Sequence, residues 1–314
     1  MTQRQAATAG LGRSLVPIVV LSLVWGCNWP ILKLGVSEMA PLTFRAYTLP
    51  LAGLGLLAVA KAAGERIAMP RSLWPLLVVL ALFNITGWNG LVLFGVQQMP
   101  AGRSAIIAYT MPVWATIVSL LVLHEPLSKR KAVGLALGMA GMLVLVADDL
   151  AAIRARPFGV AMILGAAIVW ACGTVLLRKF KPPVPQNALT GWMMLVGWVP
   201  LALAAPVLDP GWLAHVPHLS RTAWFAIVYN IVFAGTMAHW AWFTLARTLP
   251  VAVSSLSSLP VPVVGVFAGM LVLGERPGPA EWIALLLVLS ALVAVLWPGA
   301  AKTTPAAAPV APDD

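Results

Sequence analysis

The sequence predicts an all-α integral membrane protein with ten transmembrane helices in two inverted five-helix repeats, and with cytoplasmic N- and C-termini. Three observations lead to this fold class. Hydrophobic residues make up 61% of the 314-residue chain and charged residues only 10%, whereas soluble domains carry about 25% charged residues. The apolar residues gather in runs long enough to cross a bilayer. The second half of the chain also repeats uncommon residues of the first half in the same order.

Ten apolar stretches are predicted to cross the membrane, because about 20 helical residues span its hydrocarbon core. The first stretch follows Arg4 and Arg13 in the manner of a signal peptide, but it is long and lacks a small-residue cleavage site. We therefore keep it as a crossing. The ten stretches are residues 15–35, 41–61, 74–95, 101–123, 131–147, 159–179, 187–207, 221–245, 250–272 and 280–297.

The chain divides into two repeats and a tail. Residues 1–148 form the first five-helix repeat, residues 149–298 form the second, inverted repeat, and the Ala- and Pro-rich residues 299–314 predict a disordered cytoplasmic tail. Lys and Arg are more numerous in the connections that a cytoplasmic N-terminus places inside, and Lys129-Arg130-Lys131 is the clearest such run. The net charge of +10 therefore indicates membrane anchoring and excludes a basic face for nucleic acid.

Uncommon residues recur in order along the two halves. Trp25-Gly26-Cys27 returns as Trp170-Ala171-Cys172 at an offset of 145 residues, and from the third crossing onward the offset is 150. Because each half holds five crossings, an odd number, the second copy enters the membrane from the opposite side. Such inverted repeats are typical of secondary transporters, since their symmetry supplies two similar states that open to opposite sides. The pairs at offset 150 include Trp74 and Trp224, Pro112 and Pro262, and Glu125 and Glu275.

The chain resembles the EamA-type members of the drug/metabolite transporter superfamily over about residues 15–297. The tryptophan content is similar to that of the YddG-like aromatic amino-acid exporters within this superfamily. The resemblance implies ten helices in two inverted halves, an exporter of amino acids and a location in the bacterial inner membrane. It rests on Trp25-Gly26-Cys27-Asn28-Trp29, Pro41, Phe44, Arg45, Pro112, Glu125, Gly134, Gly138, Gly141, Trp170, Arg178, Pro262 and Glu275.

Polar and aromatic side chains inside the crossings predict a substrate cavity, because polar groups in lipid are costly and usually face a bundle interior. Asn89 and His239 correspond at offset 150, so we expect them on opposite sides of one cavity. Helix packing for Trp, interhelical hydrogen bonds for Asn and His, and bonding of Ser to its own helix are the alternatives. The candidate substrate-binding residues are Trp25, Asn28, Trp29, Asn84, Trp88, Asn89, Tyr109, Trp170, Tyr229, His239, Trp240, Ser254, Ser257 and Ser258.

Charged residues avoid the middle of the predicted crossings. Asp and Glu occur only at crossing ends or in connections, and His239 is the one good central candidate for carrying a proton. This favours a facilitator or a weakly coupled carrier over a dedicated proton antiporter. Lys33, Arg45 and Arg178 lie near crossing ends, where they either reach out to the interface or bind a substrate carboxylate. A helix-end or packing role is the simpler interpretation of Glu125 and Glu275.

The predicted function is a secondary transporter that exports small neutral metabolites, foremost aromatic and other bulky amino acids, by alternating access. An exporter of purines or drugs and a channel-like facilitator remain alternatives. An enzyme is disfavoured, because His124-Glu125 lacks the second His of a zinc helix motif at Ser128. A retinal-type receptor is disfavoured, because Lys33 lies near a crossing end. The expected partners are the substrate and the lipid bilayer, with no cofactor, metal or nucleic acid, and the oligomeric state stays open, a monomer included.

Overall fold

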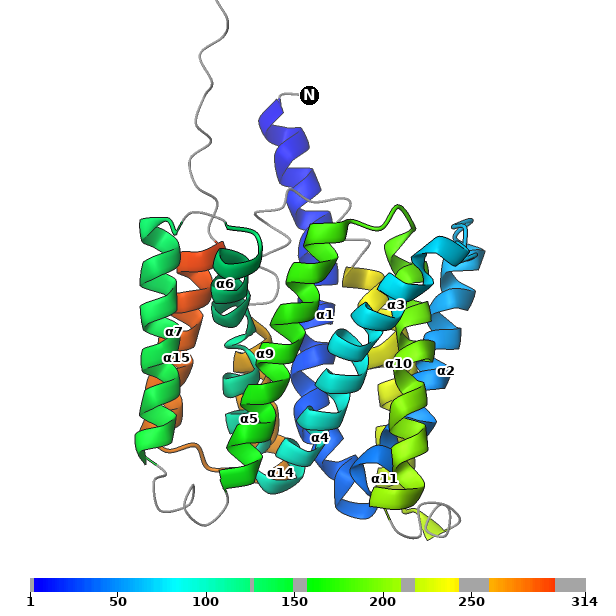
Figure 1. Cartoon of the computed structure of the whole chain (residues 1–314). Helices are drawn as coiled ribbons and strands as arrows, with labels where there is room; N and C mark the ends of the chain where they lie inside the picture. The colour runs from blue at the N-terminus through cyan, green and yellow to red at the C-terminus, as the bar shows by residue number, and fades with distance from the viewer. Residues whose placement is uncertain (1–2, 125–126, 149–156, 210–217, 243–259, 297–314) are drawn as a thin grey trace, which may run out of the picture.

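The computed structural model describes residues 3–124, 127–148, 157–209, 218–242 and 260–296. This part of the chain is a bundle of helices (Figure 1). The first half holds α1 (Gln3–Glu38), α2 (Pro41–Ala62), η1 (Arg71–Leu73), α3 (Trp74–Ala81), η2 (Leu82–Gly87), α4 (Trp88–Gln98), α5 (Ala101–Ala108), α6 (Met111–Val122) and α7 (Lys129–Asp148). The second half holds α9 (Pro157–Phe180), α10 (Gln186–Leu208), α11 (Arg221–Val228), η4 (Tyr229–Met237), α14 (Pro260–Leu273) and α15 (Pro279–Leu296).

Within these described ranges, six helical stretches are long and apolar enough to cross a bilayer. They are Val19–Glu38, Pro41–Ala62, Arg71–Gln98, Ala101–Val122, Phe158–Phe180 and Gln186–Leu208, and shorter apolar helices cover Ala132–Leu145, Pro260–Leu273 and Pro279–Ala294. The all-helical, multi-pass membrane architecture is therefore confirmed. The count of ten crossings and the side on which the termini lie stay predictions. The predicted tail, residues 299–314, lies outside the described residues.

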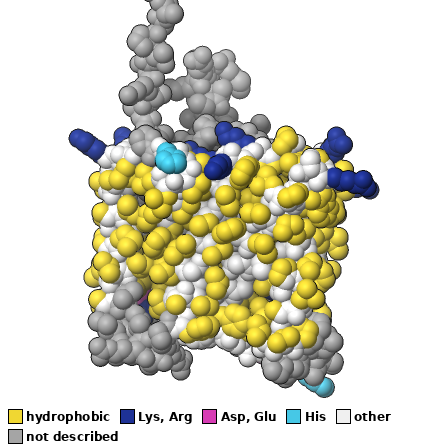
Figure 2. Space-filling view, in the orientation of Figure 1, with side chains coloured by type: hydrophobic (Ala, Val, Ile, Leu, Met, Phe, Trp, Pro, Cys, Tyr) yellow, Lys and Arg dark blue, Asp and Glu magenta, His cyan; other side chains and the backbone are white. Residues whose placement is uncertain are grey.

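The outer wall of the bundle is apolar. Figure 2 shows hydrophobic side chains over the wall and Lys and Arg side chains along the rim near the N-terminal end of α1. Large apolar residues face outward there, and Leu271 is 86% exposed. In water each such residue would cost free energy, at about 25 cal/mol per Å² of apolar surface. Exposure of the same surface to lipid carries no such cost. The apolar wall therefore agrees with the membrane location that the low charge content of the sequence predicted.

The two halves are built alike and run in opposite directions. In Figure 1 α1 leads away from the N-terminal end of the bundle, whereas α9 leads back toward it. Contacts between the halves come in equivalent pairs: α1 packs against α14, and its counterpart α9 packs against α6. Equivalent helices also pack on each other, α2 on α10 and α7 on α15. The inverted relation that the repeated residues predicted is therefore visible in the packing.

Wide, π-helical turns interrupt the third crossing of each half, which the sequence had predicted as regular helix. They are η2 and η4, and the offset of 150 places η2 onto the second part of η4. A π-turn inserts an extra residue into the helix and is frequent at functional sites. The fourth crossing, predicted over 101–123, is also divided. Its break at Tyr109 and Thr110 precedes Pro112, which has no backbone N–H to continue the helix.

Candidate substrate cavity

A cavity of about 660 Å³ lies at the centre of the bundle, between helices of both halves. Its lining extends to Arg178, near the end of α9, and to Gln186, at the start of α10. We call this side of the molecule the Arg178 end. On the other side the lining stops at Leu32 of α1, Arg45 of α2 and Val92 of α4, short of the ends of these helices. The cavity therefore reaches one end of the bundle and not the other.

The opposite side, which we call the Glu275 end, is closed by packed side chains. Val36, Phe44, Val96 and Met99 are almost completely buried there. Glu275, which follows α14, accepts hydrogen bonds from the backbone N–H groups of the first two residues of α5, at 2.6 and 3.0 Å. A carboxylate at a helix N-terminus satisfies donors that the helix itself leaves unpaired. Lys33 Nζ of α1 lies 3.4 Å from Oε1 of the same carboxylate, which links three helices at this end.

Aromatic rings form much of the cavity wall. Trp88 of α4 and Trp170 of α9 have their ring centroids 5.1 Å apart, and Trp25 meets His239 edge-on at 5.5 Å. The Trp25 indole N–H donates to the carbonyl oxygen of Ala234 at 3.3 Å, so its polar atom is satisfied while its ring faces the cavity. Such rings offer a large, rigid apolar surface to a ligand.

Several polar side chains of the cavity bond to backbone carbonyl groups in the wide turns or just before them. Asn84 and Asn89 donate their amides to the carbonyl oxygens four residues earlier, at 3.0 and 2.9 Å. His239 Nδ1 lies 3.0 Å from the Ala234 carbonyl oxygen, five residues earlier. Asn230 donates to Ala226 O at 3.0 Å. These bonds hold the polar side chains in place along the cavity wall.

The structure brings most of the predicted site residues together. Trp25, Asn28, Trp29, Asn84, Trp88, Asn89, Tyr109, Trp170 and His239 line the cavity. Asn89 and His239 both belong to it, as their correspondence across the repeat predicted.

Two predicted residues do not line the cavity. Tyr229 lies behind the wall, where its hydroxyl donates to Val24 O at 2.8 Å. Trp240 is 38% exposed and turned outward, because it follows His239 by one residue and so lies on another face of the same helix. Ser254, Ser257 and Ser258 lie outside the described residues. In this structure Tyr229 and Trp240 are therefore not part of the cavity lining.

Several lining residues were not in the list of candidate substrate-binding residues, although carboxylate binding was one of the two interpretations of Arg45. Arg45, Thr190, Asn230 and Trp242 all line the cavity. Arg45 lies only four residues after the start of α2, where an arginine normally reaches the interface. The sequence feature that pointed to Arg45 was a charged residue just inside an apolar run, beside an aromatic residue. Thr190 carried no signal, because a lone threonine in an apolar helix usually bonds to its own backbone.

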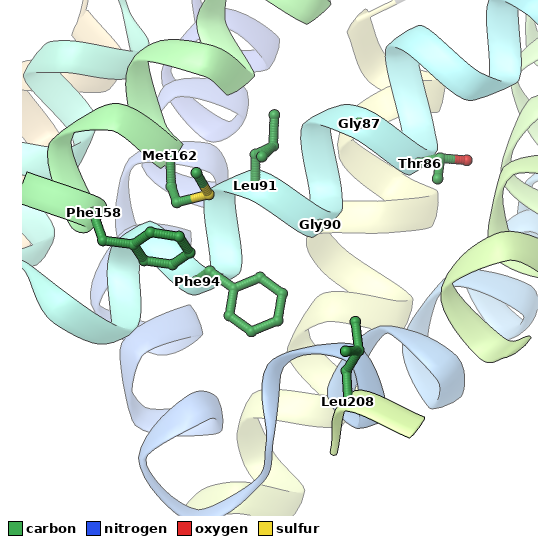
Figure 3. Close-up of a pocket in the computed structure, with 8 residues that line it drawn as sticks. All are labelled: Thr86, Gly87, Gly90, Leu91, Phe94, Phe158, Met162 and Leu208. Atoms are coloured by element: carbon green, nitrogen blue, oxygen red, sulfur yellow. The ribbon is translucent and has the colours of Figure 1, made fainter. Parts of the chain in front are cut away.

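A second hollow lies on the outer wall between α4 and α9. It is about 620 Å³, more open than the central cavity, and lined mainly by apolar side chains such as Phe94, Phe158 and Met162 (Figure 3). Its one hydroxyl, that of Thr86, already donates to Gly197 O at 2.8 Å. This hollow offers a polar substrate nothing to bind, and it suits contact with lipid.

The fold and the cavity define a class: a multi-pass membrane protein made of two inverted repeats around a central cavity. The EamA-like transporter family model matches twice, over residues 13–147 and 157–297, one copy in each half. The chain belongs to this family, and it is a membrane transporter, as the resemblance of its sequence indicated.

Relatives agree with this assignment, and a solved structure shares the fold. The inner membrane transporter YedA of Escherichia coli (strain K12), named as uncharacterized, is 28% identical over 90% of this chain and 92% of its own. An Escherichia coli (strain K12) protein named a probable amino-acid metabolite efflux pump is 26% identical over 87% of this chain and 91% of its own. A crystal structure that is 20% identical covers 90% of this chain and 97% of that chain with a TM-score of 0.64, which shows a shared fold.

Proposed function

We propose that the protein is a secondary transporter that exports aromatic and other bulky amino acids across the bacterial inner membrane by alternating access. The observation that carries the proposal is the central cavity, with a ring-lined wall and a few polar groups. Its volume of about 660 Å³ falls within the roughly 300–1,000 Å³ of small-molecule sites. Indole rings can stack on an aromatic side chain, and amide groups can bond to the amino and carboxyl groups.

The distribution of basic side chains supports a cytoplasmic location for the Arg178 end. Exposed Lys and Arg gather on this rim, at the end of α2, the start of α7 and the end of α9. Arg221 and Arg276 are exposed at the Glu275 end. Because cytoplasmic connections carry an excess of basic residues, the cavity of this state would open inward, where an exporter collects its substrate.

The inverted repeat supports alternating access. Each half supplies an equivalent set of contacts, so the packing that closes one end has a counterpart at the other. If the contacts that close the Glu275 end break while their counterparts at the Arg178 end form, the cavity opens to the other side. The net cost in free energy is small, because the two sets of contacts are equivalent. A continuously open channel would need both ends open at once, whereas this structure closes one.

The substrate class is supported by the cavity and by the relative named an amino-acid metabolite efflux pump. Among the described lining residues there is no Asp or Glu, so a cationic drug would find no counter-charge. Counterflow in proteoliposomes tests the class: internal unlabelled phenylalanine should accelerate the uptake of labelled phenylalanine, with leucine competing and adenine and a quaternary ammonium compound not competing. Uptake that never saturates would favour a channel, and preference for adenine would overturn the amino-acid assignment.

Trp25→Ala and Asn28→Ala should each lower phenylalanine counterflow by roughly 10-fold, because one removes a stacking surface and the other a polar contact of the cavity. Both proteins should remain monodisperse in detergent. The matched controls are Trp198→Ala and Gln97→Ala, since neither residue lines the cavity. The Trp198 indole bonds to Ala46 O at 2.9 Å between α10 and α2. Counterflow that is unchanged in both cavity variants would mean that substrate takes another route.

A further inference from the structure

Arg45 carries a positive charge at the closed end of the cavity. Arg45 is only 7% exposed and lines the cavity. Nη1 donates to Asn230 Oδ1 at 3.1 Å, and the guanidinium lies over the neighbouring Phe44 ring, 5.6 Å from its centroid. Nε is buried and has no hydrogen-bond partner. In the part of the chain that the structure describes, Arg45 forms no ion pair with a carboxylate.

This arrangement is costly unless something supplies the missing charge. A buried ion without a counter-ion loses hydration, and one neutral hydrogen bond and one aromatic ring compensate only part of that loss. Asn230 bonds to one guanidinium nitrogen as a neutral acceptor, so it positions the group without neutralising it. Nε and Nη2 form the other edge of the planar guanidinium, and two parallel N–H groups match the two oxygens of a carboxylate. The unpaired N–H groups of Arg45 therefore have the geometry and the charge that a carboxylate ligand requires.

Asn28 provides a second unpaired group in the same cavity. Its Oδ1 is buried and has no hydrogen-bond partner in the structure. Asn28 comes from α1 and Arg45 from α2, and both line the cavity together with the Trp25 and Trp29 rings. An amide oxygen accepts from N–H groups, so it suits an ammonium group. The guanidinium edge of Arg45 thus suits the carboxylate of an amino acid, and the amide oxygen of Asn28 suits its ammonium group. The aromatic wall suits its side chain.

We infer that Arg45, held by Asn230, binds the carboxylate of the transported molecule, and that the cavity selects carboxylate-bearing compounds with an apolar or aromatic group. This inference rests on the proposed function, because it assigns a chemical class to the substrate of the same cavity. It excludes amines that lack a carboxylate and neutral purines as good ligands. Asn28 contributes to the ammonium end, so loss of the ammonium should weaken binding less than loss of the carboxylate.

Three related probes test the inference by binding to the purified full-length protein, followed by tryptophan fluorescence or by the apparent melting temperature. They are L-phenylalanine, 3-phenylpropionate, which keeps only the carboxylate, and phenethylamine, which keeps only the amine. We expect wild type to bind both carboxylates at least 10-fold more tightly than phenethylamine. Arg45→Gln should weaken both carboxylates at least 10-fold and remove this preference.

Asn230→Asp separates a binding role of Arg45 from a structural one. The new carboxylate loses the bond from the Asn230 amide to Ala226 O, but it still accepts the Nη1 bond that joins α2 to η4. It also supplies the counter-charge from within the protein. We expect at least 10-fold weaker binding of 3-phenylpropionate in this variant. Gln97→Glu makes the same amide-to-carboxylate change outside the cavity and should bind as wild type does.

The inference is overturned if 3-phenylpropionate does not bind to wild type, if phenethylamine binds equally well, or if Asn230→Asp binds the carboxylates as wild type does. Should Arg45→Gln fail to fold, the Asn230→Asp result alone decides. Failure of the proposed function looks different, because it is the absence of counterflow or its insensitivity to Trp25→Ala and Asn28→Ala. Counterflow with no selection for carboxylates would overturn only the role of Arg45.

Discussion

Glu275→Ala is expected to open the closed end of the bundle. The change removes two charge-assisted bonds to the N-terminus of α5 and the ion pair with Lys33. One charge-assisted hydrogen bond contributes about 1.5–3 kcal/mol, and every 1.4 kcal/mol is about tenfold in an equilibrium constant. Loss of a single such bond from the closed state would therefore raise the open fraction by roughly 10- to 150-fold. Directional transport should fall accordingly, because the Glu275 end would open more often while the Arg178 end is still open.

The measurement uses a cysteine at Val36, which is 2% exposed in the closed end. The natural residues Cys27 and Cys172 are first replaced by alanine, so that only position 36 reacts. A membrane-impermeant maleimide should label Val36→Cys at least 10-fold faster when Glu275→Ala is present.

Asp209→Ala is the matched control for Glu275→Ala. The Asp209 carboxylate also accepts a backbone N–H near a helix start, that of Thr43 in α2, at 2.8 Å. It joins α10 to α2, a pair that packs together along its length. Its loss should lower stability without raising the labelling of position 36. Equal labelling in the two variants would show that Glu275 does not hold this end closed.

Gly235→Ala is expected to cause a clear loss of stability from a single methyl group. Gly235 lies in η4, where a Cβ atom would come within 2.5 Å of Ala52 Cβ and 2.6 Å of Asn230 O. Neither of these atoms can rotate away, so α2 and η4 must move apart. Overpacking of this kind costs about 1–3 kcal/mol, which corresponds to a fall of roughly 2–5 °C in the apparent melting temperature. Carboxylate binding should weaken as well, because Asn230 and Arg45 bridge the same interface.

Gly165→Ala is the control for this substitution. A Cβ atom there would meet only Leu91 Cδ1, at 3.5 Å, which is an ordinary contact. Alanine in a helix is favoured over glycine by roughly 0.5–1 kcal/mol, so the melting temperature should stay the same or rise. A melting temperature for Gly235→Ala equal to that of Gly165→Ala would contradict the close approach of α2 and η4.

The membrane setting and the repeated architecture could be predicted from the sequence, because both depend on properties that add up along the chain. Hydrophobicity sums over a stretch of residues, so the helix bounds agree with the predicted stretches to within a few residues for α2, α9 and α10. The repeat follows from the order of uncommon residues such as Trp25 and Trp170. Most of the aromatic and amide lining was predictable for a related reason: a polar group in an apolar helix must face something other than lipid.

The direction of a side chain around its helix, and the partner it meets, were decided only by the tertiary structure. Each π-turn changes the direction in which the following side chains point around the helix axis, those of Asn89 and His239 included. No residue pattern had indicated these π-turns. Trp240 and Tyr229 are as aromatic as Trp25, but their positions around the helix turn them away from the cavity. The sequence left open whether Arg45 reaches the interface or binds a carboxylate, and the structure placed it against Asn230 of the other repeat. Such contacts join residues nearly 200 positions apart, and composition and periodicity carry no information on which distant groups will meet.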